Sequence, residues 1–199
     1  MIREVRADMS RYRNKGASWG QIFGNPAVWA LSWYRFGHWL YKERSPGLLR
    51  PFGKVLYLFG YKFFEIVMEM HLDPSTEIGG GLYLGHSGAI HFNPEAVIGK
   101  NCDIAPHVTI GTSAMGRKGA PRVGNDVYVG TGATIIGKVS VGDGAKIAAN
   151  TLVITNVPAG ATVMGVPGRV VMKPVHAPSE KPLGSQQNEP VSEPARAVE

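Results

Sequence analysis

Large aliphatic residues recur at intervals of six through the middle of the chain. Their register runs in three blocks, which comprise Leu72, Ile78, Leu84 and Ile90, then Ile98, Ile104 and Ile110, then Val123, Val129, Ile135, Val141, Ile147 and Val153. Glycine directly follows many of them. This interval matches neither the 3.6-residue period of a helix nor the two-residue alternation of a strand. It predicts a solenoid of short parallel strands over residues 71–173, with aliphatic side chains inside and glycines at the corners.

The register is interrupted twice. The first interruption adds two residues, which we place around Asn93-Pro94, close to His91. The second adds the longer loop TSAMGRKGAPR, which carries Arg117 and Lys118. Both segments leave the regular coil and bring polar side chains to its outside.

Residues 1–70 show apolar side chains close to helical spacing. The segment NPAVWALSWYRFGHWLYKE predicts a helix with Asn25 as N-cap and Pro26 as first residue. The segment SPGLLRPFG ends it, and a second helix is predicted from Lys54 to Met70. Many side chains here are aromatic, namely Trp29, Trp33, Tyr34, Trp39, Tyr57, Phe59, Tyr61, Phe63 and Phe64. Helix packing or a subunit interface explains them best, and contact with a membrane surface is the alternative.

The positive charge is confined to this helical part. The chain has a net charge of +6, and residues 1–70 hold all of it, with eleven Lys and Arg against five Asp and Glu. Residues 71–199 are balanced, so no basic stripe for nucleic acid crosses the larger part. An anionic membrane surface stays open as a partner of the basic part. Residues 174–199, rich in Pro, Ser, Glu and Gln, are predicted to be a disordered tail.

Neither a signal peptide nor a membrane span is predicted. The N-terminal MIREVRADMSRYRNK is charged, and VLYLFGYKFFEIVMEM is interrupted by Lys62, Glu65 and Glu69. A membrane span needs about 20 apolar residues, so a cytoplasmic protein is expected. The single cysteine, Cys102, excludes an intramolecular disulfide and a cysteine-cluster metal site. With no base arranged beside it, Cys102 is predicted to fill a coil rather than to act as a nucleophile.

The order of motifs resembles a known family. It comprises a helical part, HLDPSTEIGGGLYLGHSGAI, IGKNCDIAPHVTIG, an extruded loop, PRVGNDVYVGTGATIIG and the ending GVPGRVV. Over about residues 30 to 173 these features resemble the hexapeptide-repeat acyltransferases, and within them the serine O-acetyltransferases and polysaccharide O-acetyltransferases. The resemblance implies a left-handed parallel β-helix and a homotrimer, alone or as a dimer of trimers, with its active site between subunits. It also implies direct transfer of acetyl from acetyl-CoA to a hydroxyl, without a metal.

In the GHSG segment, His86 matches the general base of that family. An imidazole suits the task because its pKa lies near working pH and it can accept the proton of the attacking hydroxyl. The flanking glycines allow close approach of acceptor and thioester, and they offer backbone N–H groups to a developing oxyanion. Alone, a histidine at a coil corner needs no catalytic role. The repeat context favours catalysis.

Several positions depart from the serine enzymes. The aspartate that orients the base there matches His71, and the histidine of a histidine-proline pair matches Asp73, so the two residue types have exchanged places in HLDP. Asp73 is either an orienting carboxylate or the cap of a turn before Pro74, and His71 is a second candidate. Gly85 replaces the aspartate before the base.

The loop before Pro121 also departs from that family. The Arg-His pair that grips the carboxylate of serine matches Gly119 and Ala120, which offer no bidentate contact. Arg117 and Lys118 could substitute from a shifted position, but a changed acceptor explains the departures better. We therefore expect a saccharide hydroxyl, in surface polysaccharide biosynthesis, as acceptor. L-serine is the alternative, and a catalytically silent scaffold is the alternative of another class.

The other candidates surround the expected ligands. His91 and Asn93 are expected on the acceptor side, and His107 faces outward if Ile104 and Ile110 face inward. The resemblance implies acetyl-CoA along the later coils, with contacts at Gly111, Gly130, Ala148, Arg169 and Lys173.

Overall fold

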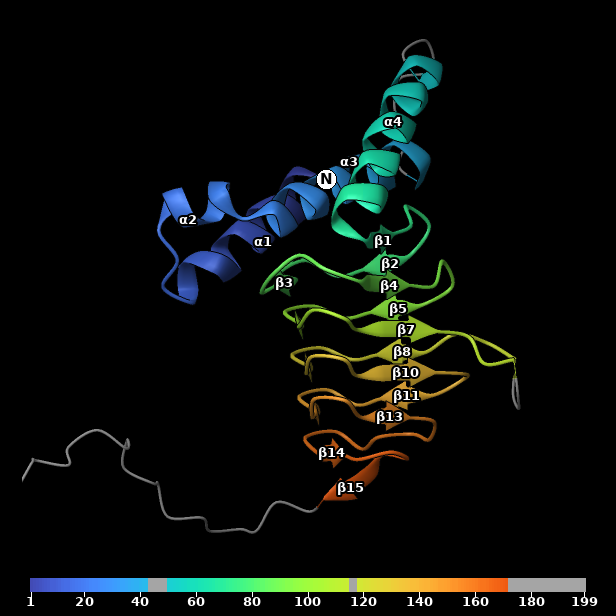
Figure 1. The fold of residues 1–199 in the computed structure, drawn as a ribbon. Helices are drawn as coiled ribbons and strands as arrows, with labels where there is room; N and C mark the ends of the chain where they lie inside the picture. The colour runs from blue at the N-terminus through green and yellow to red at the C-terminus, as the bar shows by residue number, and fades with distance from the viewer. Residues whose placement is uncertain (43–49, 115–117, 172–199) are drawn as a thin grey trace, which may run out of the picture.

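A helical part is followed by a stack of short strands in the computed structural model, which describes residues 1–42, 50–114 and 118–171 (Figure 1). The helices are α1 (Ile2–Asn14), α2 (Trp19–Gly24), α3 (Pro26–Lys42) and α4 (Arg50–Met68). The predicted tail, residues 174–199, lies outside the described residues.

The two predicted helices are α3 and α4. α3 begins at Pro26, as expected. α4 spans Arg50–Met68 rather than residues 54–70. It starts earlier because Pro51 lies in the first turn, where a missing N–H costs no helical hydrogen bond. It ends earlier because Glu69 takes a left-handed backbone conformation with φ 52°.

The strands are each two or three residues long. They are β1 (Met70–Leu72), β2 (Glu77–Ile78), β3 (Tyr83–Leu84), β4 (Ile90–Phe92), β5 (Val97–Ile98), β6 (Asp103–Ile104), β7 (Thr109–Gly111), β8 (Arg122–Val123), β9 (Tyr128–Val129), β10 (Thr134–Ile136), β11 (Ser140–Val141), β12 (Lys146–Ile147), β13 (Leu152–Val153), β14 (Thr162–Met164) and β15 (Arg169–Val171). From β1 to β10, every strand pairs in parallel with the strand three places further on. The coil therefore has three faces, formed by the sheets β1-β4-β7-β10-β13, β2-β5-β8-β11 and β3-β6-β9-β12-β14-β15.

The aliphatic register forms stacked rows inside the coils, as predicted, with one exception. In the sheet that starts with β1, Leu72 pairs with Phe92, and Phe92 pairs with Ile110. The predicted row had Ile90 in place of Phe92. Both side chains are buried because both ends of β4 face inward, so the spacing alone did not distinguish them.

This exception moves the first interruption of the register. It lies between Leu84 and Phe92, and not around Asn93-Pro94 as the sequence suggested. The segment 85–89 therefore holds two residues more than a regular corner. This is the segment that carries His86, so the inserted length belongs to the candidate catalytic segment.

The helices close the open end of the β-helix with a buried ion pair. No strand within the described residues pairs with the open side of the first coil, so its backbone groups need other partners. The Asp8 carboxylate accepts from the backbone N–H groups of residues 81–82 at 2.8 and 2.9 Å. Arg35 donates to the carbonyls of residues 78–79 at 2.6 and 2.7 Å, and to Asp8 at 2.9 Å. Burial raises the pKa of Asp8, and the charge and hydrogen bonds of Arg35 oppose this shift.

Two buried tyrosines bond to the same coil. The Tyr12 hydroxyl donates to the Leu84 carbonyl at 2.8 Å and accepts from the Leu84 N–H at 3.0 Å. The Tyr34 hydroxyl donates to the Thr76 carbonyl at 2.7 Å. Burial raises the pKa of both hydroxyls, so they remain protonated donors. In Figure 1, α1 and α3 accordingly lie over the end of the stack that begins with β1.

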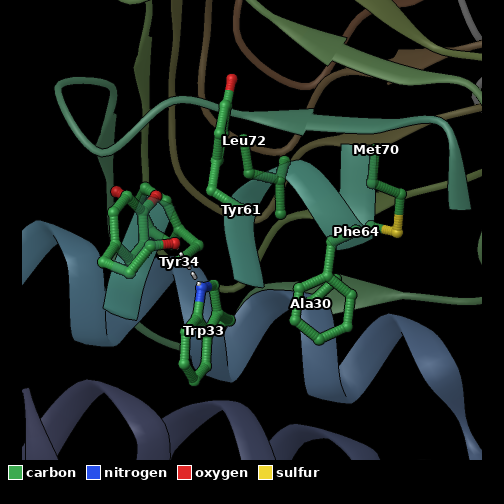
Figure 2. Close-up of a pocket in the computed structure, with 8 residues that line it drawn as sticks. Ala30, Trp33, Tyr34, Tyr61, Phe64, Met70 and Leu72 are labelled. Atoms are coloured by element: carbon green, nitrogen blue, oxygen red, sulfur yellow. Dashed lines mark hydrogen bonds between the residues drawn. The ribbon is translucent and has the colours of Figure 1, made fainter. Parts of the chain in front are cut away.

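α3 and α4 pack against each other through two glycines. A Cβ atom on Gly37 would overlap the ring of Tyr57, and one on Gly60 would overlap the ring of Trp33. The Trp33 indole donates to the Tyr57 carbonyl at 3.1 Å, the bond drawn in Figure 2. The aromatic rings around this bond leave a gap of only about 10 Å³, which is no larger than the space for one water molecule. This hollow is packing between helices rather than a ligand site.

The outer face of α4 is apolar and exposed. It consists of Phe52, Val55, Leu56, Phe59, Phe63, Ile66 and Val67. Figure 1 shows α4 extending away from the coils, with this helix at the far end of the molecule from β15. No helix within the described ranges is long and apolar enough to cross a membrane.

Candidate active site

His86 lies in the segment that joins β3 to β4, and its side chain is exposed. Gly88 and Ala89 have φ angles of 130° and 39°, in the region that glycine adopts most easily. The Gly88 carbonyl accepts from the backbone N–H of His107, in the coil below, at 3.1 Å. The segment is thus tied to the next coil by its backbone, whereas the imidazole of His86 makes no hydrogen bond to another described residue.

A pocket of about 230 Å³ opens beside His86. Its lining includes Lys15, which caps the C-terminus of α1, Tyr83 from β3 and Asp103 from β6. Lys15 Nζ lies 2.7 Å from Asp103 Oδ2, and Arg11 Nη2 lies 3.1 Å from Asp103 Oδ1. The fold therefore places an ion pair in the same pocket as the candidate base.

Sequence reasoning missed these charged residues. Lys15 and Asp103 are 88 positions apart, so no local spacing signals that they meet. Asp103 occupies the outward position of a two-residue strand whose inward residue, Ile104, carried the aliphatic register. One signal for Asp103 was present in the sequence, namely that its carboxylate had to face outward because the next residue faces inward.

Asp73 and Asn93 occupy equivalent turns on successive coils. Asp73 Oδ1 accepts from the Ser75 N–H at 2.7 Å, and Asn93 Oδ1 accepts from the Glu95 N–H at 2.9 Å. Each side chain thus closes the turn that leads into the next strand. Asp73 therefore caps its turn, which was one of its two expected roles, and the structure gives no bond between it and His86.

His71 and His91 lie beside each other on the outward face of β1 and β4. They are paired in the sheet register, and their ring centroids are 5.6 Å apart. His71 Nε2 lies 3.2 Å from Glu65 Oε1. A hydrogen bond from Lys62 lowers the pKa of Glu65. This group of side chains joins α4 to the sheet, and its members do not line the pocket beside His86.

The predicted acetyl-CoA contacts lie on two faces of the coils. Gly130 and Ala148 follow paired positions of β9 and β12, so they lie on neighbouring coils of one sheet. A Cβ atom on Gly130 would approach the Ala149 nitrogen to 2.7 Å, so the coil packing itself requires this glycine. Gly111 is on β7, in another sheet, and its open side has only Thr109 Cγ2 within 4 Å. Gly111 is thus the position where a ligand could approach the backbone.

The remaining candidates lie elsewhere. Lys118 lines a second pocket of about 400 Å³, together with Glu95, Arg122 and Lys138, at the corner between β7 and β8. Arg169 is exposed on β15, the last described strand. Arg117 and Lys173 lie outside the described residues. Within the described ranges, no three His, Cys, Asp or Glu side chains gather as a metal site would require.

The repeats, the inserted histidine segment and the adjacent pocket define a hexapeptide-repeat transferase. The family model described as bacterial transferase hexapeptide (six repeats) matches residues 120–155. The Helicobacter pylori serine acetyltransferase is 31% identical over 162 residues, which cover 81% of this chain and 88% of that protein. The chain belongs to the serine acetyltransferase family.

Solved structures agree with this membership. The Neisseria gonorrhoeae serine acetyltransferase in complex with serine has a TM-score of 0.70 at 29% identity, and the match covers 86% of this chain and 69% of that one. A serine acetyltransferase in complex with CoA has a TM-score of 0.72 at 29% identity, covering 85% and 69%. The expected left-handed parallel β-helix with N-terminal helices is confirmed. The chain is shorter than several relatives, and spans 52% of the Escherichia coli K12 serine acetyltransferase, to which it is 35% identical over 154 residues.

These relatives overturn the expected acceptor. The saccharide acceptor in polysaccharide biosynthesis is wrong, since the matching proteins and structures are serine acetyltransferases. The error came from giving too much weight to Gly119 and Ala120. A loop without charged anchors argues against serine only if the anchors have to come from that loop.

Proposed function

We propose that this chain is an acetyl-CoA-dependent O-acetyltransferase that acetylates L-serine, with His86 as general base. One observation carries the proposal. His86 is exposed on an inserted glycine-flanked segment, beside a pocket that contains charged side chains. The names of its relatives, and their solved complexes with serine and with CoA, support the choice of acceptor and donor.

In the proposed reaction, His86 removes the proton of the serine hydroxyl as the oxygen attacks the thioester carbonyl carbon. The new C–O bond forms, the C–S bond breaks, and the sulfur leaves as a thiol after taking the proton from the imidazolium. Backbone N–H groups of segment 85–89 are available to the oxyanion, because this inserted segment is not a regular strand. Gly111 offers an open backbone for the donor, and Arg169 offers a cation for its phosphates.

The proposed enzyme is a homotrimer. His86 lies at the corner between β3 and β4, whereas Lys118 lies at the corner between β7 and β8. These corners belong to different edges of the three-faced coil, so Lys118 and His86 of one chain lie at different edges. In a trimer, Lys118 of one subunit can approach His86 of its neighbour, which supports an active site between subunits.

We also propose that a second trimer covers the outer face of α4. Its apolar side chains follow the spacing of a helix–helix seam, with Phe52, Phe59 and Ile66 seven residues apart. The basic residue that borders this face, Lys62, is already paired with Glu65 at 2.6 Å. A paired lysine is a poor anchor for anionic lipid, so a protein partner suits this face better than a membrane. Light scattering should give the mass of a particle of six chains, and Phe59→Glu should reduce this mass to that of three chains. Binding of the protein to anionic vesicles, without a six-chain particle, would instead favour a membrane as the partner of this face.

The direct test of the activity is release of CoA thiol from acetyl-CoA with L-serine as acceptor. We expect serine-dependent release in the full chain, and a loss of about 10²-fold or more in His86→Ala, as expected for a general base. The melting temperature of His86→Ala should equal that of the wild type, because the His86 imidazole makes no hydrogen bond to another residue that the structure describes. No serine-dependent release would refute the acceptor, and full activity of His86→Ala would refute the base. If no hydroxyl acceptor is acetylated, the result would favour the alternative that the protein is a catalytically silent scaffold.

A further inference from the structure

Lys15 and Asp103 line the pocket beside His86, and Arg11 contacts Asp103 from outside that lining. Asp103 accepts from Arg11 through Nε at 3.3 Å and Nη2 at 3.1 Å, and it also pairs with Lys15 at 2.7 Å. Two cations thus share one carboxylate. Arg11 alone makes two contacts with Asp103, and it has a further bond to the Asn101 carbonyl at 3.1 Å. The carboxylate therefore keeps a partner if Lys15 turns away from it.

Lys15 is the more accessible member of this set. Its side chain is 36% exposed, against 18% for Asp103. Its ammonium lies 4.6 Å from the ring centroid of Tyr83, which forms a wall of the pocket. The lysine head is thus held over an aromatic face at the pocket, with one strong contact, to Asp103.

A small zwitterion fits this arrangement. We propose that Lys15 binds the carboxylate, and Asp103 the ammonium, of an amino-acid acceptor whose hydroxyl points to His86. The ligand exchanges one ion pair of the free protein for two new ones, while Arg11 positions Asp103. The volume of about 230 Å³ is below the range of drug-sized ligand pockets, and so suits a small acceptor. The proposal rests on the proposed function for the role of His86.

This assignment also explains the loop before Pro121. Gly119 and Ala120 offer no charge to an acceptor, yet the relatives act on serine by name. Lys15, at the C-terminal end of α1, would supply the missing cation from the helical part of the same chain. The specificity of the enzyme would then depend on the contact between α1 and the first two coils.

The test compares acceptors that differ by one charge. Serinamide lacks the carboxylate, and 3-hydroxypropionate lacks the ammonium. In the wild type, the KM of L-serine should be about tenfold or more below that of either analogue, as expected for a charged contact. Lys15→Met should remove the advantage over serinamide and leave the KM of acetyl-CoA unchanged, and Lys15→Arg should restore part of it. Asp103→Asn should remove the advantage over 3-hydroxypropionate.

The matched control is Lys42→Met, which removes another exposed lysine, paired with Glu77 at 3.0 Å outside the pocket. It should leave the KM of every acceptor unchanged. A merely structural role of Lys15 would change serine and serinamide equally and lower the melting temperature. An unchanged ratio between serine and serinamide in Lys15→Met would overturn the proposal.

A binding measurement separates this proposal from the proposed activity. Titration calorimetry of L-serine with the full-length His86→Ala protein should show binding, which adding Lys15→Met weakens about tenfold or more. If serine binds through Lys15 but is never acetylated, the activity fails and the binding site stands. If serine is acetylated but Lys15→Met neither weakens binding nor changes the acceptor ratio, the activity stands and the binding site is wrong.

Discussion

The coils and the helical cap of this protein are built on different principles. In the coils, each strand bonds to the next coil through its backbone, and aliphatic side chains stack inside. The cap, formed by α1 and α3, has no strand to offer. It meets the first coil through the polar groups of Asp8, Arg35, Tyr12 and Tyr34. Apolar side chains of α3, namely Ala27, Ala30 and Leu31, also join the buried core of the coils. The coils therefore depend on a repeated pattern, whereas the cap depends on a few single residues.

This difference predicts that replacing one buried residue of the cap lowers the free energy of unfolding more than replacing a residue on the surface of the coils. Arg35→Met leaves the Asp8 carboxylate buried without its ion-pair partner, and removes two bonds to coil carbonyls. Removing one partner of a buried pair costs about 3–5 kcal/mol. We expect this loss in the free energy of unfolding, measured with urea.

Lys42→Met is the control for Arg35→Met. The Lys42–Glu77 pair also joins α3 to the first coil, but it is exposed, and such pairs contribute about 0–1 kcal/mol. If the two variants lost equal stability, the cap would not be held by its buried polar contacts.

A second change acts within the helical part. Gly60→Ala places a methyl group into the ring of Trp33 and forces α3 and α4 apart. Overpacking of this kind costs about 1–3 kcal/mol. Gly20→Ala, in α2, is matched to it because its methyl group would have only Ser18 Oγ nearby, at 3.9 Å. A thermal melt should show a lower midpoint for Gly60→Ala and no loss for Gly20→Ala; equal midpoints would argue against close contact at Gly60.

A third change tests the coils at their turns. Asp73→Ala removes the bond to the Ser75 N–H, and Asn93→Ala removes the equivalent bond one coil below. Each should cost about 1 kcal/mol, as the loss of a helix cap does. Both should keep kcat with serine, because these side chains close turns. If kcat fell tenfold in Asp73→Ala but not in Asn93→Ala, and the stability of Asp73→Ala were normal, the result would indicate that Asp73 orients His86.

The same contrast explains what the sequence could predict. The coil interior was predictable where its inward positions repeat. The register missed Phe92, because β4 turns two apolar side chains inward, and it ended before the buried Val157 and Val163. The cap anchors were not predictable, because Asp8 lies 73 positions from the backbone group it binds. Nothing in a local pattern separates such a residue from a solvated surface charge.

The candidate site divides in the same way. His86 could be found from its motif, and its inserted segment could be found from the register once Phe92 replaced Ile90. Lys15 and Asp103 could not, because they meet only after α1 docks on the coils. Residues 119 and 120 misled the choice of acceptor, because a motif shows where a family carries its charged contacts and does not exclude contacts from another part of the fold.

The last prediction involves no change in stability and concerns Cys102, which lies inside the second coil and donates to the Gly124 carbonyl at 3.2 Å. Burial raises the pKa of its thiol to about 11. Since the thiolate is the reactive form, iodoacetamide should label the native protein at least about 100-fold more slowly than a free thiol at neutral pH, with the rate rising as pH approaches 11. The thiol also reports on the coils separately from the cap. Slow labelling should persist in Arg35→Met below its melting temperature if only the cap has loosened, and fast labelling there would mean that cap and coils unfold together.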